Sequence, residues 1–201
     1  MIYLASRSPR RRELLAQIGV RFEPLLFREG NRADRDNDEA VLPGEQPDDY
    51  VRRVTRLKAE AAWARVMQRR GVQRKPVLAA DTTVTLAGEI LGKPADREDA
   101  VRLLRLLSGT EHRVLTAVAM AYDGRYEMVV SDSRVTFAAL DDARINAYVR
   151  TGEPFDKAGG YGIQGRAGAF IVRLEGSYSG VMGLPLYETA NLLRLFGVTV
   201  P

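Results

Sequence analysis

The stretch SRSPRRR over residues 6–12 brings together hydroxyl groups, a proline and four arginines directly after the first apolar segment. Proline is favoured at the first position of a helix and serine just before it, so a helix should begin at Pro9 with Ser8 as its cap. The free N–H groups of a helix start attract anions, and the nearby side chains add donors and positive charge. The stretch is compatible with phosphate binding, but an ordinary helix cap beside solvated arginines has the same pattern, so the rest of the chain must decide between them.

A second candidate for chemistry is Asp81, which with Thr82 directly follows the apolar run 76–80. Such a run is typical of a short strand buried in the middle of a sheet, and we expect Asp81 at its carboxyl end. A carboxylate in that position is costly unless it is paired, hydrogen-bonded or bound to a metal. We therefore expect Asp81 to have a partner of one of these kinds.

Two lysines are expected near this carboxylate. Lys93 lies in the turn 92–94, and Lys58 lies next to the inward stripe of a long helix predicted over 47–70. In open α/β sheets ligands collect where strands end, so residues 6–11, Asp81 and the turn should line one crevice. Cationic groups around an acidic centre suit a polyphosphate held with a hard divalent cation such as Mg²⁺ or Mn²⁺.

Several chemistries are excluded by composition. The chain has no cysteine, which rules out disulfides, thiolate metal sites and thiol nucleophiles. Its one histidine, His112, cannot form a multi-histidine zinc site and is predicted to be a structural or surface residue. Neither a Walker-type phosphate loop nor a GxGxxG turn follows a predicted strand, which argues against the nucleotide folds that carry them.

The overall composition describes one ordinary globular protein. The chain has 201 residues, of which 45% are apolar and 28% charged, and its formal net charge is +4. We expect a single domain over 1–201, because no linker or repeat divides it. No apolar run approaches the ~18 residues of a membrane span, and the N-terminus does not resemble a signal peptide, so a cytoplasmic location without membrane contact is expected.

The charges are unevenly distributed along the chain. Residues 28–49 hold eight acidic side chains against three arginines, whereas 51–75 hold nine basic residues and one glutamate. A solvated helix face accounts for most of the basic cluster. Nucleic-acid binding through it remains an alternative, although Trp63 is the one aromatic residue within it and no nucleic-acid partner is expected.

The predicted elements form an α/β fold with a twisted, mixed sheet flanked by helices. The first strand is expected at 2–5. A polar, mobile loop is expected at 28–46. The glycines of the glycine-rich stretch at 157–165 could serve only to bend the chain. Further strands are expected at 20–26, 76–80, 114–122, 126–138 and 169–174, with a hairpin at 83–91. Helices are expected at 9–18, 47–70, 96–107, 141–150 and 186–196.

Taken in order, the motifs resemble those of the Maf nucleotide pyrophosphatases, a family named for septum-formation inhibition. No single motif is decisive, but the ordered set spans nearly the whole chain. The motifs are SRSPRR (6–11), DT (81–82), GKP (92–94), LSG (107–109), DKAG (156–159), YGIQG (161–165) and MGLP (182–185).

The resemblance implies hydrolysis of a nucleoside triphosphate to its monophosphate and pyrophosphate, with a divalent metal. It also implies a homodimer and a two-lobed α/β fold with a central cleft, similar to that of inosine triphosphatases. Arg10, Thr82 and Gln164 match the positions of the branch that acts on dTTP and UTP. The branch acting on 7-methyl-GTP typically has tyrosine at the position of Arg10 and Asp-Gln in place of Asp81-Thr82.

Further site residues follow from the resemblance. Asp81 matches the family's proton acceptor and metal ligand, and it can activate water directly or through Mg²⁺ or Mn²⁺. The phosphate-binding and metal-bridging residues it implies are Ser6, Ser8, Arg11, Lys58 and Lys93. An inosine-triphosphatase-like activity on purines, and a nucleic-acid-binding or septum-regulating protein without hydrolase activity, are the alternatives.

The loop after the second predicted strand departs from the family pattern. The family places a glutamate there, and Glu39 is its natural counterpart and the second candidate metal ligand. The surrounding segment 28–45 is longer and more charged than the pattern. A solvated acidic loop is therefore the alternative reading of Glu39.

Overall fold

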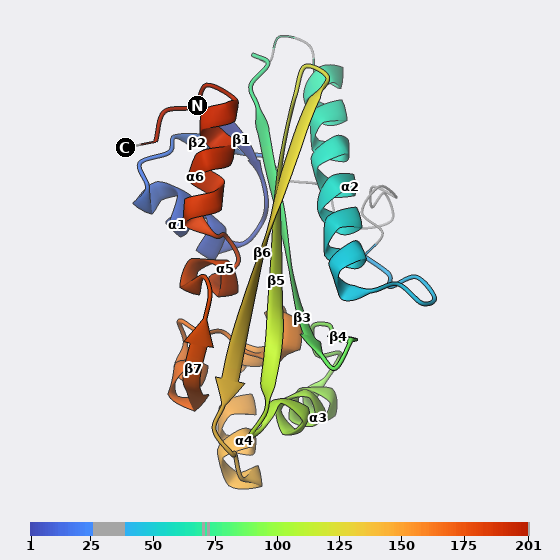
Figure 1. The fold of residues 1–201 in the computed structure, drawn as a ribbon, viewed down its shortest axis with the longest axis vertical. Coiled ribbons are helices and arrows are strands. Elements are labelled where there is room, and N and C mark those ends of the chain that lie inside the picture. Colours follow the sequence, from blue (N-terminus) through green and yellow to red (C-terminus); the bar gives the residue numbers. More distant parts are fainter. Residues whose placement is uncertain (26–38, 70, 72, 201) are drawn as a thin grey trace.

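The computed structural model describes residues 1–25, 39–69, 71 and 73–200. At its centre is a seven-stranded sheet in the order β2-β1-β3-β5-β6-β7, with the short β4 also paired to β3 (Figure 1). Strand β1 runs parallel to both neighbours and the other pairs are antiparallel, so the sheet is mixed. The strands are β1 (Ile2–Ala5), β2 (Phe22–Pro24), β3 (Val77–Leu86), β4 (Glu89–Leu91), β5 (Glu111–Tyr122), β6 (Arg125–Phe137) and β7 (Ile171–Glu175).

Helices cover both faces of this sheet. Helix α2 lies along one face, and α1 and α6 lie on the other (Figure 1). Helices α3 and α4 lie at the end of the long strands β5 and β6 that is away from α1 and α6 (Figure 1). Three short 3-10 segments lie at 153–156, 158–160 and 166–170. The α-helices are α1 (Pro9–Gln17), α2 (Pro47–Gln68), α3 (Arg97–Leu107), α4 (Asp142–Val149), α5 (Tyr178–Met182) and α6 (Leu186–Leu195).

The alternation of side chains along β3 decides which helix each residue meets. Val77 and Ala79 belong to the core under α2, together with Ala59 and Ala62 of that helix. Leu78 and Ala80 instead join the core under α1 and α6. Because successive side chains of a strand point to opposite faces, Asp81 must face α2 and Thr82 must face α1.

A separate apolar core fills the other end of the sheet. It contains Val84, Leu91 and Phe137 of the strands, with residues of α3 and α4. A cavity is lined both by Ala80 of the first end and by Val84 of the second. The predicted α/β fold, with a mixed sheet, flanking helices, two lobes and a central cleft, is therefore confirmed.

Most of the predicted elements are present, with three differences. Strand β3 does not end at residue 80 but continues to Leu86, so Asp81 lies in the middle of a strand and not at its carboxyl end. The five-residue helix α5 was not predicted, and β7 begins at Ile171 because a 3-10 turn occupies 166–170. Residues 26–38, which include most of the predicted mobile loop, lie outside the described residues.

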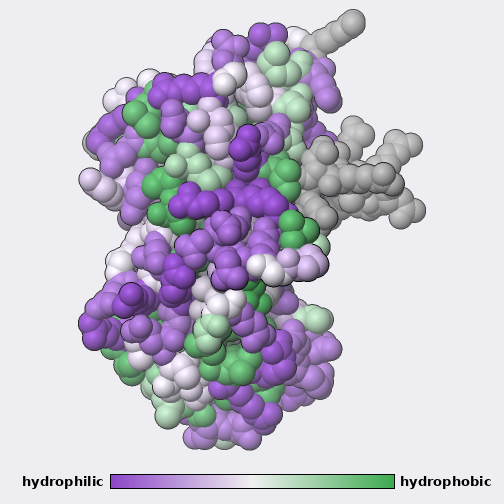
Figure 2. Space-filling view, turned by 45° about the vertical axis from the view of Figure 1, so that its right-hand side comes forward, coloured by the Kyte–Doolittle hydropathy of each residue, from purple (hydrophilic) through white to green (hydrophobic). Residues whose placement is uncertain are grey.

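The surface is largely polar in the view of Figure 2, where hydrophobic side chains form small groups among hydrophilic ones. Within the described part of the chain, no helix combines the length and apolar character needed to cross a membrane.

Candidate active site

The candidate site lies at a gap along the edge of β3. Strand β1 leaves β3 after the pair Ala5 and Ala79, and β4 joins it only at Val84. Between these points the edge of β3 is open, and side chains from both faces of the strand reach one cavity of about 780 Å³. That volume lies within the range of small-molecule sites and is large enough for a nucleotide.

On the α2 face, two carboxylates meet one ammonium group. Lys58 Nζ lies 2.7 Å from Asp81 Oδ1 and 2.6 Å from Glu39 Oε1. The side chains of Lys58 and Asp81 are each only 14% exposed, whereas Glu39 is 48% exposed. Thr83 Oγ1 adds a longer contact of 3.4 Å to the second oxygen of Asp81. The predicted acidic centre is therefore present, and it is paired.

The environment of Glu39 favours its ionised form. Burial raises its pKa, but the charge and hydrogen bond of Lys58, with help from Lys93 and Arg11, outweigh this and leave the pKa below its usual value. Tyr50 holds the same segment, because its hydroxyl donates to the Glu39 backbone carbonyl at 3.0 Å. Burial, followed by the charges of Asp81 and Glu39, raises the pKa of Tyr50 to about 12, so it stays protonated.

On the opposite face, Arg11 is held by three groups. Its Nε donates to the Gly183 carbonyl at 2.8 Å, and its two terminal nitrogens donate to Thr82 Oγ1 at 3.1 Å and Ser6 Oγ at 3.3 Å. Ser8 caps α1 as expected, accepting the Arg11 backbone N–H at 3.4 Å. Burial lowers the pKa of Arg11, and the charge of Asp81 opposes this shift. A fixed guanidinium beside a helix start is well suited to phosphate oxygens.

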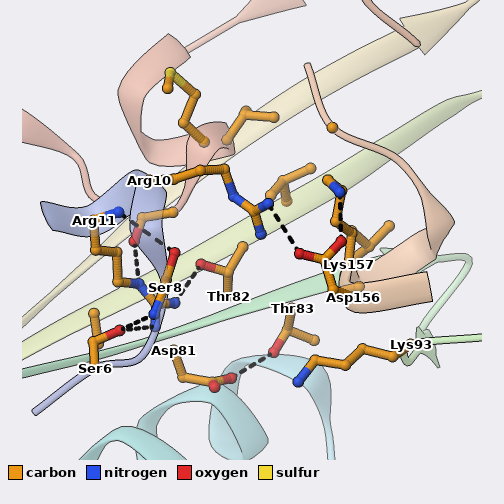
Figure 3. Close-up of a pocket in the computed structure, with 18 of the residues that line it drawn as sticks. Ser6, Ser8, Arg10, Arg11, Asp81, Thr82, Thr83, Lys93, Asp156 and Lys157 are labelled. Atoms are coloured by element: carbon orange, nitrogen blue, oxygen red, sulfur yellow. Dashed lines mark hydrogen bonds and ion pairs between the residues drawn. The ribbon is translucent and has the colours of Figure 1, made fainter. Parts of the chain in front are cut away.

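Two further cations lie at the mouth of the cavity. Arg10 forms an ion pair of 3.4 Å with Asp156, which connects the start of α1 to the 3-10 segment at 153–156 (Figure 3). Lys93 extends from the turn after β4 and its side chain is exposed. The structure therefore brings every predicted phosphate-binding residue to the same cavity.

The predicted base-reading residue Gln164 also lines this cavity, on an exposed turn. The turn is held from behind by Glu153, a residue that the sequence analysis did not single out. Its carboxylate accepts from the Arg166 backbone N–H at 3.1 Å and from the Tyr148 hydroxyl at 3.0 Å. A Cβ on Gly165 would lie 2.1 Å from that carboxylate, so any other residue here would displace Glu153 from its present position.

His112 has the structural role expected of it. It is 2% exposed, and its Nε2 lies 2.7 Å from the Tyr161 hydroxyl, at the start of the glutamine turn. Its ring also packs edge-on against Phe137. His112 therefore ties the turn to the sheet and does not itself line the cavity.

The donor set is suited to a hard divalent cation. Asp81 and Glu39 both contact Lys58 Nζ, so their oxygens already converge on one point. Carboxylate oxygens are the ligands that Mg²⁺ and Mn²⁺ prefer, with water and phosphate oxygens completing the coordination. Asp156 also lines the cavity, but it pairs with Arg10. Across the described residues no cluster of three or more potential protein ligands exists.

The family model described as Maf-like protein matches residues 1–196. This chain belongs to the Maf family. Among curated relatives of this Maf protein, the dTTP/UTP pyrophosphatase of Ralstonia nicotianae is 59% identical, over 99% of this chain and 95% of that protein. The dTTP/UTP pyrophosphatase of Dechloromonas aromatica is 56% identical, over 98% of this chain and 97% of that protein.

Among solved structures, the Staphylococcus aureus Ham1 protein matches 68% of this Maf protein and 71% of its own chain. Its sequence identity is 17% and the TM-score is 0.44. A likeness of this degree carries no argument about function.

Proposed function

We propose that this Maf protein hydrolyses dTTP, UTP and modified pyrimidine nucleoside triphosphates to the nucleoside monophosphate and pyrophosphate. The observation that carries the proposal is the position of Asp81, a carboxylate paired with Lys58 and near Arg11 in a nucleotide-sized cavity. The relatives that carry the name dTTP/UTP pyrophosphatase match nearly the whole chain, which supports the same substrates here.

The proposed reaction is attack of water on the α-phosphorus with pyrophosphate as the leaving group. Asp81 accepts the proton of the attacking water, and the 2.7 Å ion pair with Lys58 holds this carboxylate in position. Negative charge that develops on the phosphate oxygens is stabilised by fixed donors, which need no rearrangement during the reaction. The residues proposed for this are Ser6, Ser8, Arg11, Lys58 and Lys93.

We assign Asp81 and Glu39 as the protein ligands of a divalent cation, Mg²⁺ or Mn²⁺. When bound, such a cation neutralises phosphate charge and lowers the pKa of coordinated water. Lys58 lies between the two carboxylates, so it balances their charges and keeps them close together.

Base recognition is assigned to Arg10, Thr82 and Gln164. Uracil and thymine present an N3–H donor beside carbonyl acceptors, and one carboxamide offers both an acceptor and a donor to that edge. Gln164 is exposed at the cavity and free to make such a pair. Cytosine has no hydrogen on N3, so it would meet the opposite pattern.

The names of the relatives favour this enzyme over the nucleic-acid-binding or septum-regulating alternative. Part of the basic cluster on α2 is also neutralised within the protein, because Arg53 pairs with Glu45 and Arg56 with Glu60. A homodimer and a cytoplasmic location stay predictions.

The proposal is tested by incubating the purified protein with UTP, dTTP, CTP, GTP and ITP in the presence of Mg²⁺ or Mn²⁺. We expect pyrophosphate and the monophosphate from UTP and dTTP. Absence of pyrophosphate from every nucleotide would overturn the proposal, and preferential hydrolysis of ITP would favour the purine alternative.

A further inference from the structure

A row of polar groups crosses the sheet beside the cavity, on the face covered by α1 and α5. Thr82 of β3 and Thr116 of β5 are direct cross-strand partners, and their hydroxyl oxygens lie 3.0 Å apart. Thr116 Oγ1 also lies 2.7 Å from the carbonyl oxygen of Gly180 in α5. Thr116 is 0% exposed and does not line the cavity, whereas Thr82 does.

The close approach of α5 depends on a glycine. A Cβ on Gly180 would lie 3.0 Å from Ser131 Oγ, on the strand next to Thr116. A Cβ there would also lie 3.0 Å from Ser177 Cβ, so Ser131, Ser177 or α5 would have to shift by a few tenths of an ångström to admit it. Gly180 and Ser131 therefore allow the Gly180 carbonyl to lie close to the buried Thr116 hydroxyl.

Counting protons along the row fixes the direction of each hydrogen bond. A carbonyl oxygen can only accept, so the single proton of Thr116 points to Gly180. Thr116 is then an acceptor toward Thr82, and the single proton of Thr82 points to Thr116. Arg11 can only donate, and it donates to the Thr82 oxygen at 3.1 Å. Thr82 is left with one lone pair and no proton for a ligand in the cavity.

We propose that Thr116, acting through Thr82, is a specificity-determining positioning residue for the base. This rests on the proposed function. With its proton committed to Thr116, Thr82 can only accept, and it shares the N3–H of uracil or thymine with the Gln164 amide oxygen in a bifurcated hydrogen bond. Phosphate oxygens have no hydrogen to offer it, and neither does N3 of cytosine. A free threonine hydroxyl could face a ligand as donor or as acceptor. The row of hydrogen bonds from Arg11 to Gly180 limits the Thr82 hydroxyl to the acceptor role.

The test compares kcat/KM for UTP and CTP in the wild type and in three variants. Thr116→Val keeps the shape of the side chain but removes its hydroxyl, so the Thr82 proton becomes free to turn toward cytosine N3. We expect the CTP/UTP ratio of kcat/KM to rise about five- to tenfold, the effect of one hydrogen bond. Thr116→Ser keeps the hydroxyl and should therefore have the CTP/UTP ratio of the wild type.

Thr85→Val is the matched control. Thr85 is a buried strand residue of β3 that does not line the cavity, and its hydroxyl has no hydrogen-bond partner. It should leave the ratio unchanged. The inference is overturned if Thr116→Val is active with an unchanged ratio, or if Thr85→Val shifts the ratio equally.

A measurement on the wild type keeps the inference testable if Thr116→Val does not fold. UTP methylated at N3 lacks the hydrogen that Thr82 would accept, so its kcat/KM should be far below that of UTP. Equal hydrolysis of both would overturn the inference and the N3–H pairing assigned to Gln164, while leaving the proposed hydrolysis of UTP intact. Failure to hydrolyse UTP itself would instead overturn the proposed function.

Discussion

Lys58 Nζ lies 2.7 Å from Asp81 Oδ1, and the same ammonium group contacts Glu39 Oε1 at 2.6 Å. The pair joins α2 to the exposed edge of β3, so helix packing and site geometry depend on each other. Because Lys58 keeps Glu39 as a partner when Asp81 changes, the fold should tolerate loss of the Asp81 charge. Chemistry and stability can therefore be separated at this position.

Asp81→Asn should reduce turnover of UTP by ~10²–10⁴, because asparagine cannot accept a proton from water. Circular dichroism and the thermal unfolding midpoint should stay close to those of the wild type. Asp142→Asn is the control, since that carboxylate pairs with Arg105 far from the cavity and its loss should leave turnover unchanged. Full activity in Asp81→Asn would remove Asp81 from the mechanism.

Removal of divalent cations with a chelator should abolish pyrophosphate release, and Mg²⁺ or Mn²⁺ should restore it. Glu39→Gln should raise the metal concentration for half-maximal activity at least about tenfold, since one of two carboxylate ligands is lost. Glu60→Gln changes an exposed glutamate on the outer face of α2 and should not alter the metal titration. An unchanged titration in Glu39→Gln would exclude Glu39 as a metal ligand and leave it only as a partner of Lys58.

Gln164→Leu should lower kcat/KM for UTP and dTTP about tenfold or more, because the base edge would face an apolar group. The loss should be smaller for nucleotides that the wild type already uses poorly. Gln17→Leu, at the exposed end of α1, serves as the control. Equal losses for all nucleotides would contradict a role in base recognition.

Glu153→Ala should raise KM for UTP about fivefold with a smaller change in kcat. The variant loses the bonds to the Arg166 N–H and the Tyr148 hydroxyl, so the turn that carries Gln164 is less well ordered. The same substitution at Glu175 on β7, outside the cavity, is the control. A fall in kcat at unchanged KM would assign Glu153 to the chemical step.

His112 should make the protein less stable in mild acid. Burial lowers its pKa to about 4 in the folded state, against about 6.5 when unfolded. Its neutral form therefore supports the fold above pH 6.5, and this contribution is lost as the pH falls from 6.5 toward 4. Urea unfolding should show a loss of about 2 kcal/mol between pH 7.5 and 5. His112→Gln should be less stable at pH 7.5 but should lack most of that pH dependence.

Local patterns in the sequence were sufficient to identify much of the fold. Ser8 and Pro9 predicted the start of α1, and the apolar spacing of α2 predicted that Lys58 lies beside its inward stripe. The same reasoning ended the strand before Asp81, because the apolar run stops at Ala80. The strand continues because β3 stays paired with β5 through Asp81, whose carboxylate is balanced by Lys58, and tertiary contacts of this kind have no local signal.

The supporting residues of the site were missed for a related reason. Thr116 lies inside a strand, and any residue of similar size and shape would fit the strand pattern of the sequence. The role proposed for its hydroxyl depends on Thr82 and Gly180, which only the fold brings beside it. Glu153 looks like an ordinary turn residue until Gly165 is seen against its carboxylate. Motifs located the residues that face the cavity, whereas the residues behind them required coordinates.

The central claim is that Asp81 directs water to the α-phosphorus, and hydrolysis of UTP in ¹⁸O-labelled water tests it most directly. Mass spectrometry of the products should find the label in UMP and not in pyrophosphate, with the reaction lost in Asp81→Asn. Label in pyrophosphate, or formation of UDP and inorganic phosphate, would contradict the account.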